Sequence, residues 1–207
     1  FFSDGAEIKK GNIAFHVEGC SRSILTAERL VLNFMQRMSG IASATHELCM
    51  VIKGTKARIL DTRKTTPLLR EIEKMAVAIG GGENHRFGLY DMILIKDNHI
   101  DFAGGIEKAI DAAQNYIDEK KKSLKIEIEA RNINDVKLIL NRGGVHRIML
   151  DNFTPESLKE AVTLIHGKYE TEASGGITKE NILSYAQTGV DFISVGVASG
   201  GATVEAD

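Results

Sequence analysis

The sequence has few of the residues that mark secreted, zinc-bound or membrane proteins. It has no tryptophan, two prolines and two cysteines, and no apolar run approaches the roughly 18 residues that a membrane helix needs. Cys20 and Cys49 belong to no CxxC or Cys/His pattern, which argues against a disulfide framework and a zinc site. The first ten residues, FFSDGAEIKK, lack the basic-then-apolar order of a signal peptide. We therefore expect a cytoplasmic protein with no membrane segment.

The net charge is also small. A formal net charge of −2 gives the chain no general attraction to nucleic acid or to anionic membranes. With 207 residues, of which 43% are hydrophobic, the chain can bury one substantial core and a smaller appendage. Any binding of anions must therefore depend on a local cluster of positive side chains.

The N-terminal part predicts a short strand and then an amphipathic helix. Residues 12–17 alternate as a strand does, and Thr26 is the expected N-cap of a helix over residues 26–43. Its apolar residues recur at helical spacing: Leu30, Phe34, Met38 and Ile41. The small residues of SGIASAT that follow would let another backbone approach closely, at a helix–helix or subunit contact. Arg29, taken alone, would be a solvated charge on this helix.

Beyond this helix, short β-rich runs alternate with helical stretches. The strands are expected at 57–60, 92–95, 125–128, 147–150, 169–173 and 192–195, and the helices at 67–79, 105–118, 132–140, 155–165 and 178–188. Connections this short require parallel strands and right-handed crossovers, so the fold is α/β, either a barrel or a doubly wound sheet.

The polar residues that follow the strands favour the barrel. Functional-looking side chains follow nearly every strand: Asp61, Arg63, Lys64, Lys96, Asp97, Glu129, Asp151, Asn152, Glu172, Ser174 and Ser194. The carboxyl ends of all strands meet at one mouth in a β/α barrel, whereas an open sheet uses only those at its switch point. Because there are six strands instead of eight, we expect an open or incomplete β/α barrel.

The positive charge is concentrated between residues 61 and 100. Five cationic or imidazole side chains gather there: Arg63, Lys64, His85, Arg86 and Lys96. An arginine can grip a carboxylate or phosphate with two parallel hydrogen bonds, and a lysine offers a compact charge for a diphosphate. An ordinary charged loop is the alternative. The cluster suits a ligand with several carboxylates or phosphates better than it suits nucleic acid.

Lys96 has a second interpretation. A lysine at the end of a barrel strand, next to Asp97, could form a Schiff base as in an aldolase. That chemistry requires a lysine pKa lowered by an apolar or cationic pocket, and it would not need three further anion-binding groups. The surrounding cations favour anion binding.

Two carboxylates are candidates for the same mouth. Glu127 and Glu129 share one face of their strand, and we expect one of them to be a solvated charge. Glu129 lies closer to the carboxyl end. Asp151 follows the apolar run RIML, where a carboxylate is costly unless it meets a cation, a metal or hydroxyls. Neither Glu129 nor Asp151 belongs to a dedicated metal cage.

Two glycine-containing turns are candidates for a phosphate site. Ser174, Gly175 and Gly176 follow a strand and lead to a helix expected near Thr178, and Gly196 ends the next strand. Barrels commonly hold a phosphate between the loops after their last two strands. Gly80 to Gly82, by contrast, are expected to end a helix, since glycine accepts the left-handed conformation found there.

Several of these strings occur together in one known family. DTRKTTP, GGGENHRFGLYD and LIKDNHI, followed in order by IEIEARN, IMLDNF, EASGGI and DFISVG, resemble quinolinate phosphoribosyltransferase over nearly the whole chain. The resemblance implies transfer of a phosphoribosyl group from phosphoribosyl pyrophosphate to quinolinate with decarboxylation. The products would be nicotinate mononucleotide, diphosphate and carbon dioxide, in NAD biosynthesis.

The resemblance also implies domains and partners. Residues 1–25 would be the remainder of an N-terminal α/β sandwich domain, so that the sequence is a fragment, and residues 26–207 the open α/β barrel. The helix over residues 26–43 would form a subunit contact in a homodimer, with Arg29 entering the neighbour's active site. Magnesium would bind with the diphosphate of the donor, near Glu129 and Asp151 but only indirectly.

Residue roles follow from the matched motifs. The expected catalytic residues are Lys64, Lys96, Glu129 and Asp151. The expected substrate-binding residues are Arg29, Thr62, Arg63, Lys64, His85, Arg86, Lys96, Glu129, Asp151, Ser174, Gly175, Gly176 and Gly196. His85 and Arg86 match a pair that holds the pyridine dicarboxylate, and Glu129 and Asp151 match acidic residues near the ribose.

The chain departs from the family pattern at two places. Many relatives have TTPGLR where this chain has TTPLLR, with Leu68 in place of glycine. After Gly196 many relatives continue with a polar pair, whereas this chain continues VASGGATVEAD, which affects the last phosphate contact. Two alternatives remain: a related phosphoribosyltransferase that uses nicotinate or another base, and a truncated barrel that binds phosphorylated ligands without turnover.

Overall fold

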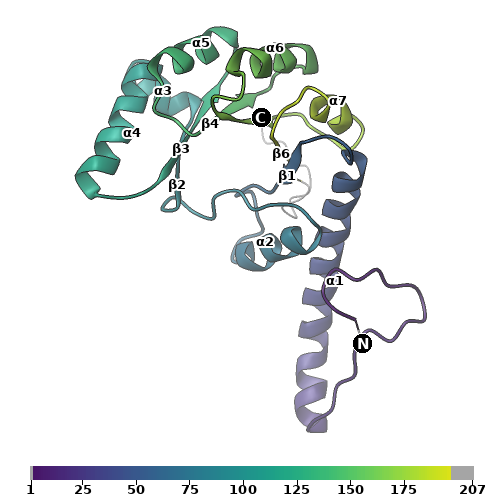
Figure 1. Cartoon of the computed structure of the whole chain (residues 1–207). Coiled ribbons are helices and arrows are strands. Elements are labelled where there is room, and N and C mark those ends of the chain that lie inside the picture. Colours follow the sequence, from purple (N-terminus) through teal and green to yellow (C-terminus); the bar gives the residue numbers. More distant parts are fainter. Residues whose placement is uncertain (1, 197–207) are drawn as a thin grey trace.

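A single six-stranded parallel sheet forms the centre of the structure, a computed structural model that describes residues 2–196. Its strands are β1 (Arg58–Leu60), β2 (Met92–Ile95), β3 (Lys125–Ala130), β4 (Arg147–Asp151), β5 (Glu170–Ser174) and β6 (Phe192–Ser194). The order β1-β6-β5-β4-β3-β2 is that of a barrel in which β1 and β2 remain unpaired with each other (Figure 1). The expected open β/α barrel is therefore confirmed, and all six strands lie within two residues of their expected positions.

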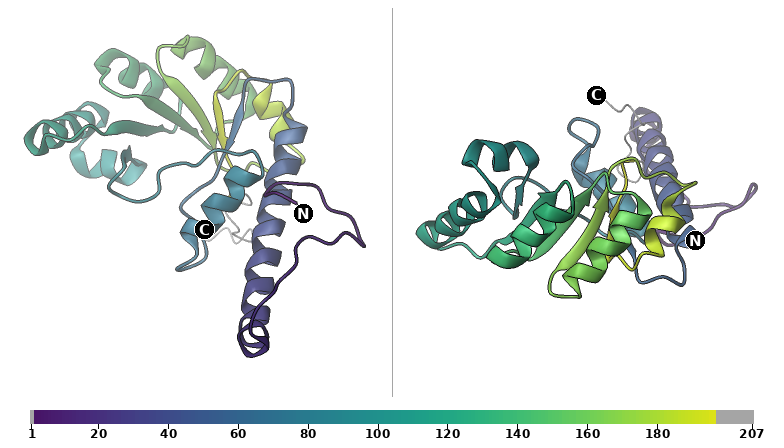
Figure 2. Two further views of the ribbon diagram at one scale, coloured as in Figure 1. Left: turned by 60° about the horizontal axis from the view of Figure 1, so that its bottom comes forward. Right: turned by 90° about the horizontal axis from the view of Figure 1, so that it is seen from above.

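Seven helices accompany the strands in the described residues. They are α1 (Ser21–Val51), α2 (Arg70–Ile79), α3 (Asp97–Ala103), α4 (Ile106–Lys120), α5 (Ile133–Arg142), α6 (Pro155–Ile165) and α7 (Ile182–Ala186). Helices α3 to α7 lie outside the curved sheet, and α2 packs beside α1 near the open side of the barrel (Figures 1 and 2). None of the helices between residues 2 and 196 is both long and apolar enough to span a membrane.

The core is built from the apolar residues of the strands and the facing helices. Ile126, Ile128, Ile148 and Ile193 are fully buried. Each such side chain contributes about 1.5–3 kcal/mol through the hydrophobic effect. The strands alternate these residues with side chains on the inner face, and this inner face carries the polar groups of the site.

The open side of the barrel is partly filled by the chain between β1 and β2. Glu83 pairs with the edge of β1, where its N–H donates to the Ile59 carbonyl at 2.8 Å and its carbonyl accepts from the Asp61 N–H at 3.1 Å. The cationic segment is therefore anchored to β1 at this point, before His85 and Arg86 follow.

The N-terminal expectations were wrong in their details. Residues 12–17 form no strand, and α1 begins at Ser21 instead of Thr26. Thr26 lies within the helix, where its hydroxyl donates to the Arg22 carbonyl at 2.7 Å instead of capping an N-terminus. Helix α3 was not predicted, and α7 begins at Ile182, later than the expected Thr178.

The small residues of α1 serve a contact within the same chain. Gly80, at the end of α2, approaches α1 so closely that a Cβ there would lie 2.4 Å from the Ala42 carbonyl oxygen. The following Gly81 has φ +93°, so the expected left-handed helix end is confirmed. The small residues thus allow α2 to pack on α1 and hold the cationic segment against the barrel.

Candidate functional site

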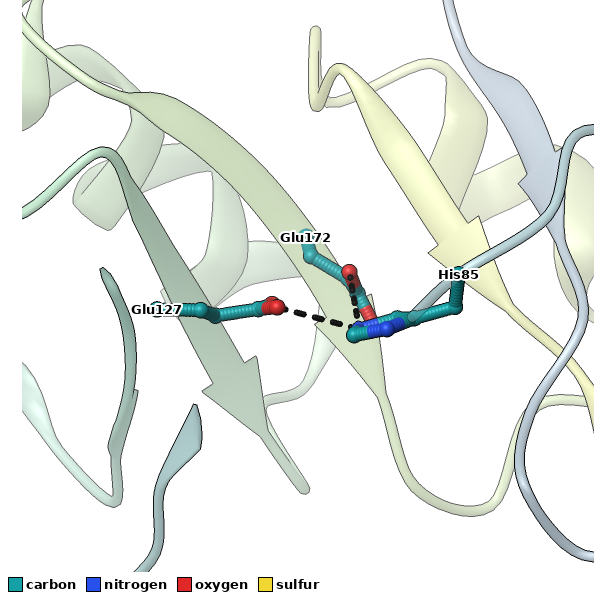
Figure 3. Close-up of side chains that lie close together, drawn as sticks. All are labelled: His85, Glu127 and Glu172. Atoms are coloured by element: carbon teal, nitrogen blue, oxygen red, sulfur yellow. Dashed lines mark ion pairs between the residues drawn. The ribbon is translucent and has the colours of Figure 1, made fainter. Parts of the chain in front are cut away.

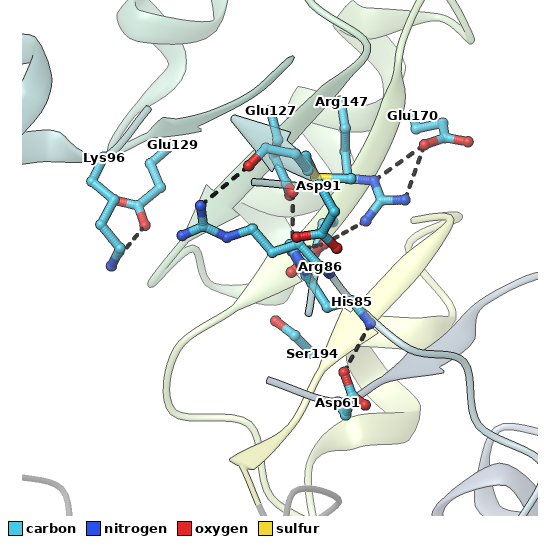
Figure 4. A network of polar contacts seen from close by, with 12 residues as sticks. Asp61, His85, Arg86, Asp91, Lys96, Glu127, Glu129, Arg147, Glu170 and Ser194 are labelled. Atoms are coloured by element: carbon cyan, nitrogen blue, oxygen red, sulfur yellow. Dashed lines mark hydrogen bonds and ion pairs between the residues drawn. The ribbon is translucent and has the colours of Figure 1, made fainter. Parts of the chain in front are cut away.

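The carboxyl ends of the strands and the loops that follow them bring most of the expected residues to one mouth. Lys96 follows β2, Glu129 lies near the end of β3, and Asp151 ends β4. The Lys96 Nζ lies 3.4 Å from a Glu129 oxygen, and the other Glu129 oxygen accepts from the Asp97 N–H at 3.1 Å (Figure 4). We call Glu129 and Asp151, with Lys96 beside them, the acidic side of the mouth.

Asp151 shows that negative charge accumulates on this side. Burial raises the pKa of the Asp151 carboxyl, and Glu129 and Asp97 raise it further, although Lys96 and Lys64 act in the opposite direction. A raised pKa shows that the nearby lysines do not fully balance the negative charge around this carboxylate. The acidic side can therefore stabilise positive charge that develops on a ligand.

Arg63 and Arg86 form the basic side of the same mouth. Burial lowers the pKa of the Arg86 guanidinium, and the nearby Arg63 lowers it further. The Arg63 Nε is buried and has no hydrogen-bond partner among residues 2–196. Two neighbouring guanidinium groups, one with an unpaired buried donor, provide the setting in which a carboxylate or phosphate would bind strongly.

His85 lies between the basic side and the interior of the barrel. Its Nδ1 accepts from the Arg86 N–H at 2.7 Å. Its Nε2 lies 3.0 Å from a Glu127 oxygen and 3.4 Å from a Glu172 oxygen (Figure 3). The side chain is 7% exposed. Both ring nitrogens of His85 are thus directed at groups of the protein itself.

Glu127 corrects one expectation about the strand face. It shares the inner face with Glu129 as expected, but it is not solvated, because both Glu127 and Glu172 are completely buried inside the barrel. Arg147, on β4 between them, places its Nη1 3.0 Å from Glu172 and contacts Glu170 with the rest of its guanidinium (Figure 4). A single sequence does not show that these strand charges meet in one buried cluster.

A buried ion pair holds the backbone of His85. Asp61, which follows β1, accepts from the Lys74 Nζ at 2.5 Å and from the His85 N–H at 2.8 Å. The Lys74 Nζ also donates to the His85 carbonyl at 2.9 Å. Asp61 was an expected mouth residue, but it is fully buried. Lys74 was not predicted from the sequence, because a lysine on a helix is ordinarily solvated.

The loop that carries Arg63 and Lys64 is held from behind by two helices. Glu73 of α2 is buried and accepts from the Thr66 N–H at 3.0 Å and from the Arg37 Nε at 2.8 Å. Arg37 belongs to α1. The hydroxyl of Thr62 accepts from the Lys64 N–H at 3.0 Å. These contacts set the backbone of the loop and leave the Lys64 side chain exposed.

The loops after β4 and β5 are joined at the candidate phosphate turn. The Asn152 N–H donates to the Ser174 carbonyl at 2.8 Å, and a Cβ on Gly175 would lie 2.1 Å from the Asn152 Oδ1. Gly175 also has φ +91°, so both the close contact and the backbone conformation require glycine at this position. Gly176 and Gly196 have open space where a Cβ would be, which leaves room for a ligand. Residues 197–207 lie outside the described residues.

Among the described residues, one group of three side chains is close enough to hold a metal ion: His85, Glu127 and Glu172. The hydrogen bond from the Arg86 N–H to Nδ1 argues against a metal there. An Nδ1 that accepts a hydrogen bond carries no proton, so Nε2 of a neutral imidazole carries it and has no lone pair for a metal. Glu129 and Asp151 are not part of this group.

Comparisons with known proteins show which family the chain resembles. Residues 41–205 match the family model described as quinolinate phosphoribosyl transferase, C-terminal domain, and residues 1–39 match that of the N-terminal domain. A Nicotiana tabacum relative, "Quinolinate phosphoribosyltransferase [decarboxylating] 2b, mitochondrial", is 47% identical over 95% of this chain and 59% of its own length. A Bacillus subtilis relative, described as a probable nicotinate-nucleotide pyrophosphorylase [carboxylating], is 42% identical over 93% and 65%.

Solved structures agree in fold. The crystal structure of NadC from Streptococcus pyogenes aligns with a TM-score of 0.89 and 39% identity, over 96% of this chain and 68% of that chain. The nicotinate-nucleotide pyrophosphorylase from Francisella tularensis aligns with a TM-score of 0.82 and 44% identity, over 87% and 63%. The chain spans 59% of the length of the Nicotiana tabacum relative. The chain belongs to the quinolinate phosphoribosyltransferase family.

Proposed function

We propose that the protein to which this chain belongs transfers the phosphoribosyl group of phosphoribosyl pyrophosphate to quinolinate, with loss of carbon dioxide. The observation that carries the proposal is the division of the mouth into a basic side, with an unpaired buried donor on Arg63, and an acidic side around Glu129 and Asp151. A dicarboxylate fits the first side and a ribosyl centre that becomes positive fits the second.

The chemistry needs positioning more than covalent participation. As the bond from the ribose to diphosphate breaks, the leaving group takes the electron pair, and the lone pair of the pyridine nitrogen forms the new bond to the ribose. Arg63 and Arg86 would hold the two carboxylates, and Glu129 and Asp151 would stabilise the positive ribosyl carbon. The quaternised ring then accepts the electrons left by carbon dioxide, and a proton takes its place.

The donor end would use the remaining expected residues. Lys64 and Lys96 supply exposed charges for the diphosphate, and the turn Ser174–Gly176 with Gly196 supplies the phosphate end. Magnesium bound with the diphosphate would neutralise part of its charge. Glu129 and Asp151 fit such an ion only through water or diphosphate oxygens, because they belong to no three-ligand group within residues 2–196.

Turnover tests this activity and separates it from its alternatives. Purified protein is mixed with phosphoribosyl pyrophosphate, magnesium and either quinolinate or nicotinate, and released diphosphate and carbon dioxide are measured. We expect both products with quinolinate and little diphosphate with nicotinate, which leaves one cationic contact of the basic side unused. Faster turnover of nicotinate would favour the related transferase, and no diphosphate with either acceptor would favour a binding protein without turnover.

We also propose a homodimer in which Arg29 serves the neighbouring subunit. Arg29 is exposed and lies 12 residues, or about 18 Å of helix, before Ile41, where α1 first becomes buried. This part of α1 projects from the barrel (Figure 1). Several of its apolar side chains are exposed, among them Leu30 at 61%. A two-fold contact would cover that face and would place two copies of Arg29 symmetrically.

Complementation between two inactive variants tests this assignment. Chains with Arg29→Ala and chains with Lys96→Ala are mixed, unfolded and refolded together, and assayed. Some mixed dimers then contain one site with both residues intact, so part of the activity should return. Arg22→Ala, about two turns earlier on α1, is the matched control that should stay active. If heterodimers form and the mixture stays inactive, Arg29 does not act across the interface.

The cytoplasm is our proposed location. The two cysteines are unpaired and Cys20 is exposed, which fits a reducing compartment. Some plant relatives are described as mitochondrial or chloroplastic. Fractionation of cells that express the native protein, followed by immunodetection, distinguishes these compartments.

A further inference from the structure

Contacts with the protein hold both the backbone and the ring of His85. Its N–H donates to Asp61 and its carbonyl accepts from Lys74, at 2.8 and 2.9 Å. Its Nε2 faces Glu127 and Glu172, and its Nδ1 accepts from the Arg86 N–H (Figure 3). Hydrogen bonds thus fix the backbone and Nδ1, directly before the arginine of the basic side. Nε2 points between two carboxyl groups without a well-aligned hydrogen bond to either.

The bond from the Arg86 N–H determines which ring nitrogen carries the proton. At 2.7 Å, two N–H groups cannot face each other, so Nδ1 must be unprotonated. The neutral imidazole then carries its proton on Nε2, where it points between the Glu127 and Glu172 carboxyl groups. An imidazolium would have to break the bond to the Arg86 backbone.

The two carboxyl groups near Nε2 favour a charged ring, and the hydrogen bond at Nδ1 opposes it. Burial works to lower the pKa of His85, but Glu127 and Glu172 outweigh it and raise that pKa to about 9, while burial and Glu172 raise the pKa of Glu127 to about 7. Near neutral pH the two groups therefore share one proton beyond that of the neutral ring. Because the pKa of His85 lies above that of Glu127, the charges alone would place this extra proton on the ring. The Arg86 N–H at 2.7 Å leaves no place for a proton on Nδ1, so the geometry places it on Glu127 instead. Burial acts to raise the pKa of Glu172, but its contacts with His85 and with Arg147, whose Nη1 lies 3.0 Å away, outweigh burial and keep it ionised.

We propose that His85 is a positioning residue that acts on the acceptor through the backbone of Arg86. In this arrangement Glu127 in its acid form and Glu172 in its ionised form hold the neutral ring, and neither touches the substrate. The three residues then contribute to quinolinate binding by fixing where the Arg86 guanidinium lies. This inference rests on the proposed function for its kinetic tests, but its first test needs no turnover.

The protonation of the ring is measured directly by NMR. The full chain is labelled with ¹⁵N at histidine, and long-range proton–nitrogen spectra are recorded near pH 7, with the His85 signals assigned by their loss in His85→Gln. We expect an unprotonated Nδ1 and a protonated Nε2. Two protonated nitrogens, or a proton on Nδ1, would overturn the proposal. This result does not depend on which reaction the protein catalyses.

Two substitutions of His85 separate positioning from ligand contact. The amide oxygen of asparagine can occupy the place of Nδ1 and accept from the Arg86 N–H, whereas the amide of glutamine reaches toward Nε2. We expect His85→Asn to retain most of kcat/KM for quinolinate and His85→Gln to lose about 10²-fold, as misplacement of a binding group by about 1 Å does. The KM for phosphoribosyl pyrophosphate should change little in either variant. Equal losses, or better rescue by glutamine, would overturn the proposal.

The two glutamates provide a matched pair. Glutamine resembles a protonated carboxyl group, so Glu127→Gln should lower kcat/KM for quinolinate less than Glu172→Gln does. Glu172→Gln should lower it at least tenfold because Arg147 loses its charged partner. Circular dichroism of each variant confirms folding. If Glu172→Gln does not fold, Glu127→Gln is compared with Glu127→Ala, and only the alanine variant should lose quinolinate binding. The proposal would be overturned if Glu127→Gln were as impaired as Glu172→Gln, or, where that variant does not fold, as impaired as Glu127→Ala.

Discussion

Two lysine–carboxylate pairs near the mouth of the barrel have opposite settings. Lys74 and Asp61 are 2.5 Å apart with side chains 3% and 0% exposed, whereas Lys96 and Glu129 are 3.4 Å apart with side chains 48% and 10% exposed. Burial raises the pKa of Asp61 in spite of Lys74, so desolvation there outweighs the attraction. The first pair holds the backbone of His85, and the second faces the open mouth (Figure 4).

The buried pair therefore has a structural role, and the exposed pair is available to ligands. A buried pair cannot exchange partners without leaving a charge in a dry interior, so it keeps the basic side in one geometry. An exposed pair loses little when it separates, since water replaces the contact. Lys96 can therefore move from Glu129 to an incoming anion, and Glu129 is then available to a positive centre.

The largest effect should appear when the buried pair is broken. Lys74→Met leaves Asp61 charged and unpaired, so we expect the free energy of unfolding to fall by about 3–5 kcal/mol. Lys96→Met is the matched control and should change stability by about 0–1 kcal/mol while removing activity. Urea unfolding followed by circular dichroism measures both. Equal stability losses would remove the distinction between the two pairs.

A double substitution sharpens this result. Asp61→Asn combined with Lys74→Met removes both charges, so it should regain part of the stability that Lys74→Met alone loses. If the double variant is less stable than the single one, hydrogen bonds of Asp61 to His85, and not an uncompensated charge, dominate the loss.

The acidic side should show its effect in turnover. Glu129→Ala and Asp151→Ala remove negative charge opposite a ribosyl centre that becomes positive, so we expect kcat to fall about 10²- to 10³-fold with little change in KM. Steady-state kinetics with each substrate varied in turn measure this. A rise in KM with kcat intact would instead make these residues ordinary binding contacts.

The strands could be predicted because their physics is local. RIL, MILI and RIML are short apolar runs followed at once by polar residues, and the structure places each as a parallel strand that leads to the mouth. The same alternation predicted that Lys96, Glu129 and Asp151 would meet. For these residues the spacing along the sequence determines the position in space.

The rest depends on contacts that the sequence does not encode locally. Glu127, Arg147 and Glu172 belong to three different strands, and only the curvature of the sheet brings them to one buried cluster with His85. The helix α3 was missed because DNHIDFA is short and its start depends on His99, whose ring accepts from the Lys96 N–H. Thr26 was wrongly predicted as an N-cap because threonine occurs both at N-caps and inside helices, where its hydroxyl bonds to a carbonyl one turn earlier.

The basic side should show its effect in affinity for one ligand. Arg86→Ala removes a charge-assisted contact worth about 1.5–3 kcal/mol, which corresponds to roughly 10- to 100-fold weaker binding of quinolinate. Binding of phosphoribosyl pyrophosphate should change much less. Lys64→Ala is the reciprocal variant and should weaken the donor more. Calorimetry with each ligand separately gives both constants, and equal losses for the two ligands would contradict the division of the mouth.

The smallest effect should come from Leu68, which lies on neither side of the mouth. Its φ is +67° and its side chain is fully exposed, at 101%. A left-handed conformation costs a residue with a Cβ about 1–2 kcal/mol, and the added freedom of glycine in the unfolded chain offsets part of the relief. We therefore expect Leu68→Gly to stabilise the protein by about 0.5–1 kcal/mol and to raise Tm by roughly 2 °C. Leu68→Ala keeps the backbone strain and removes only exposed apolar surface, so differential scanning calorimetry should show no rise in Tm for it. A rise equal to that of Leu68→Gly would assign the effect to the surface instead of the backbone.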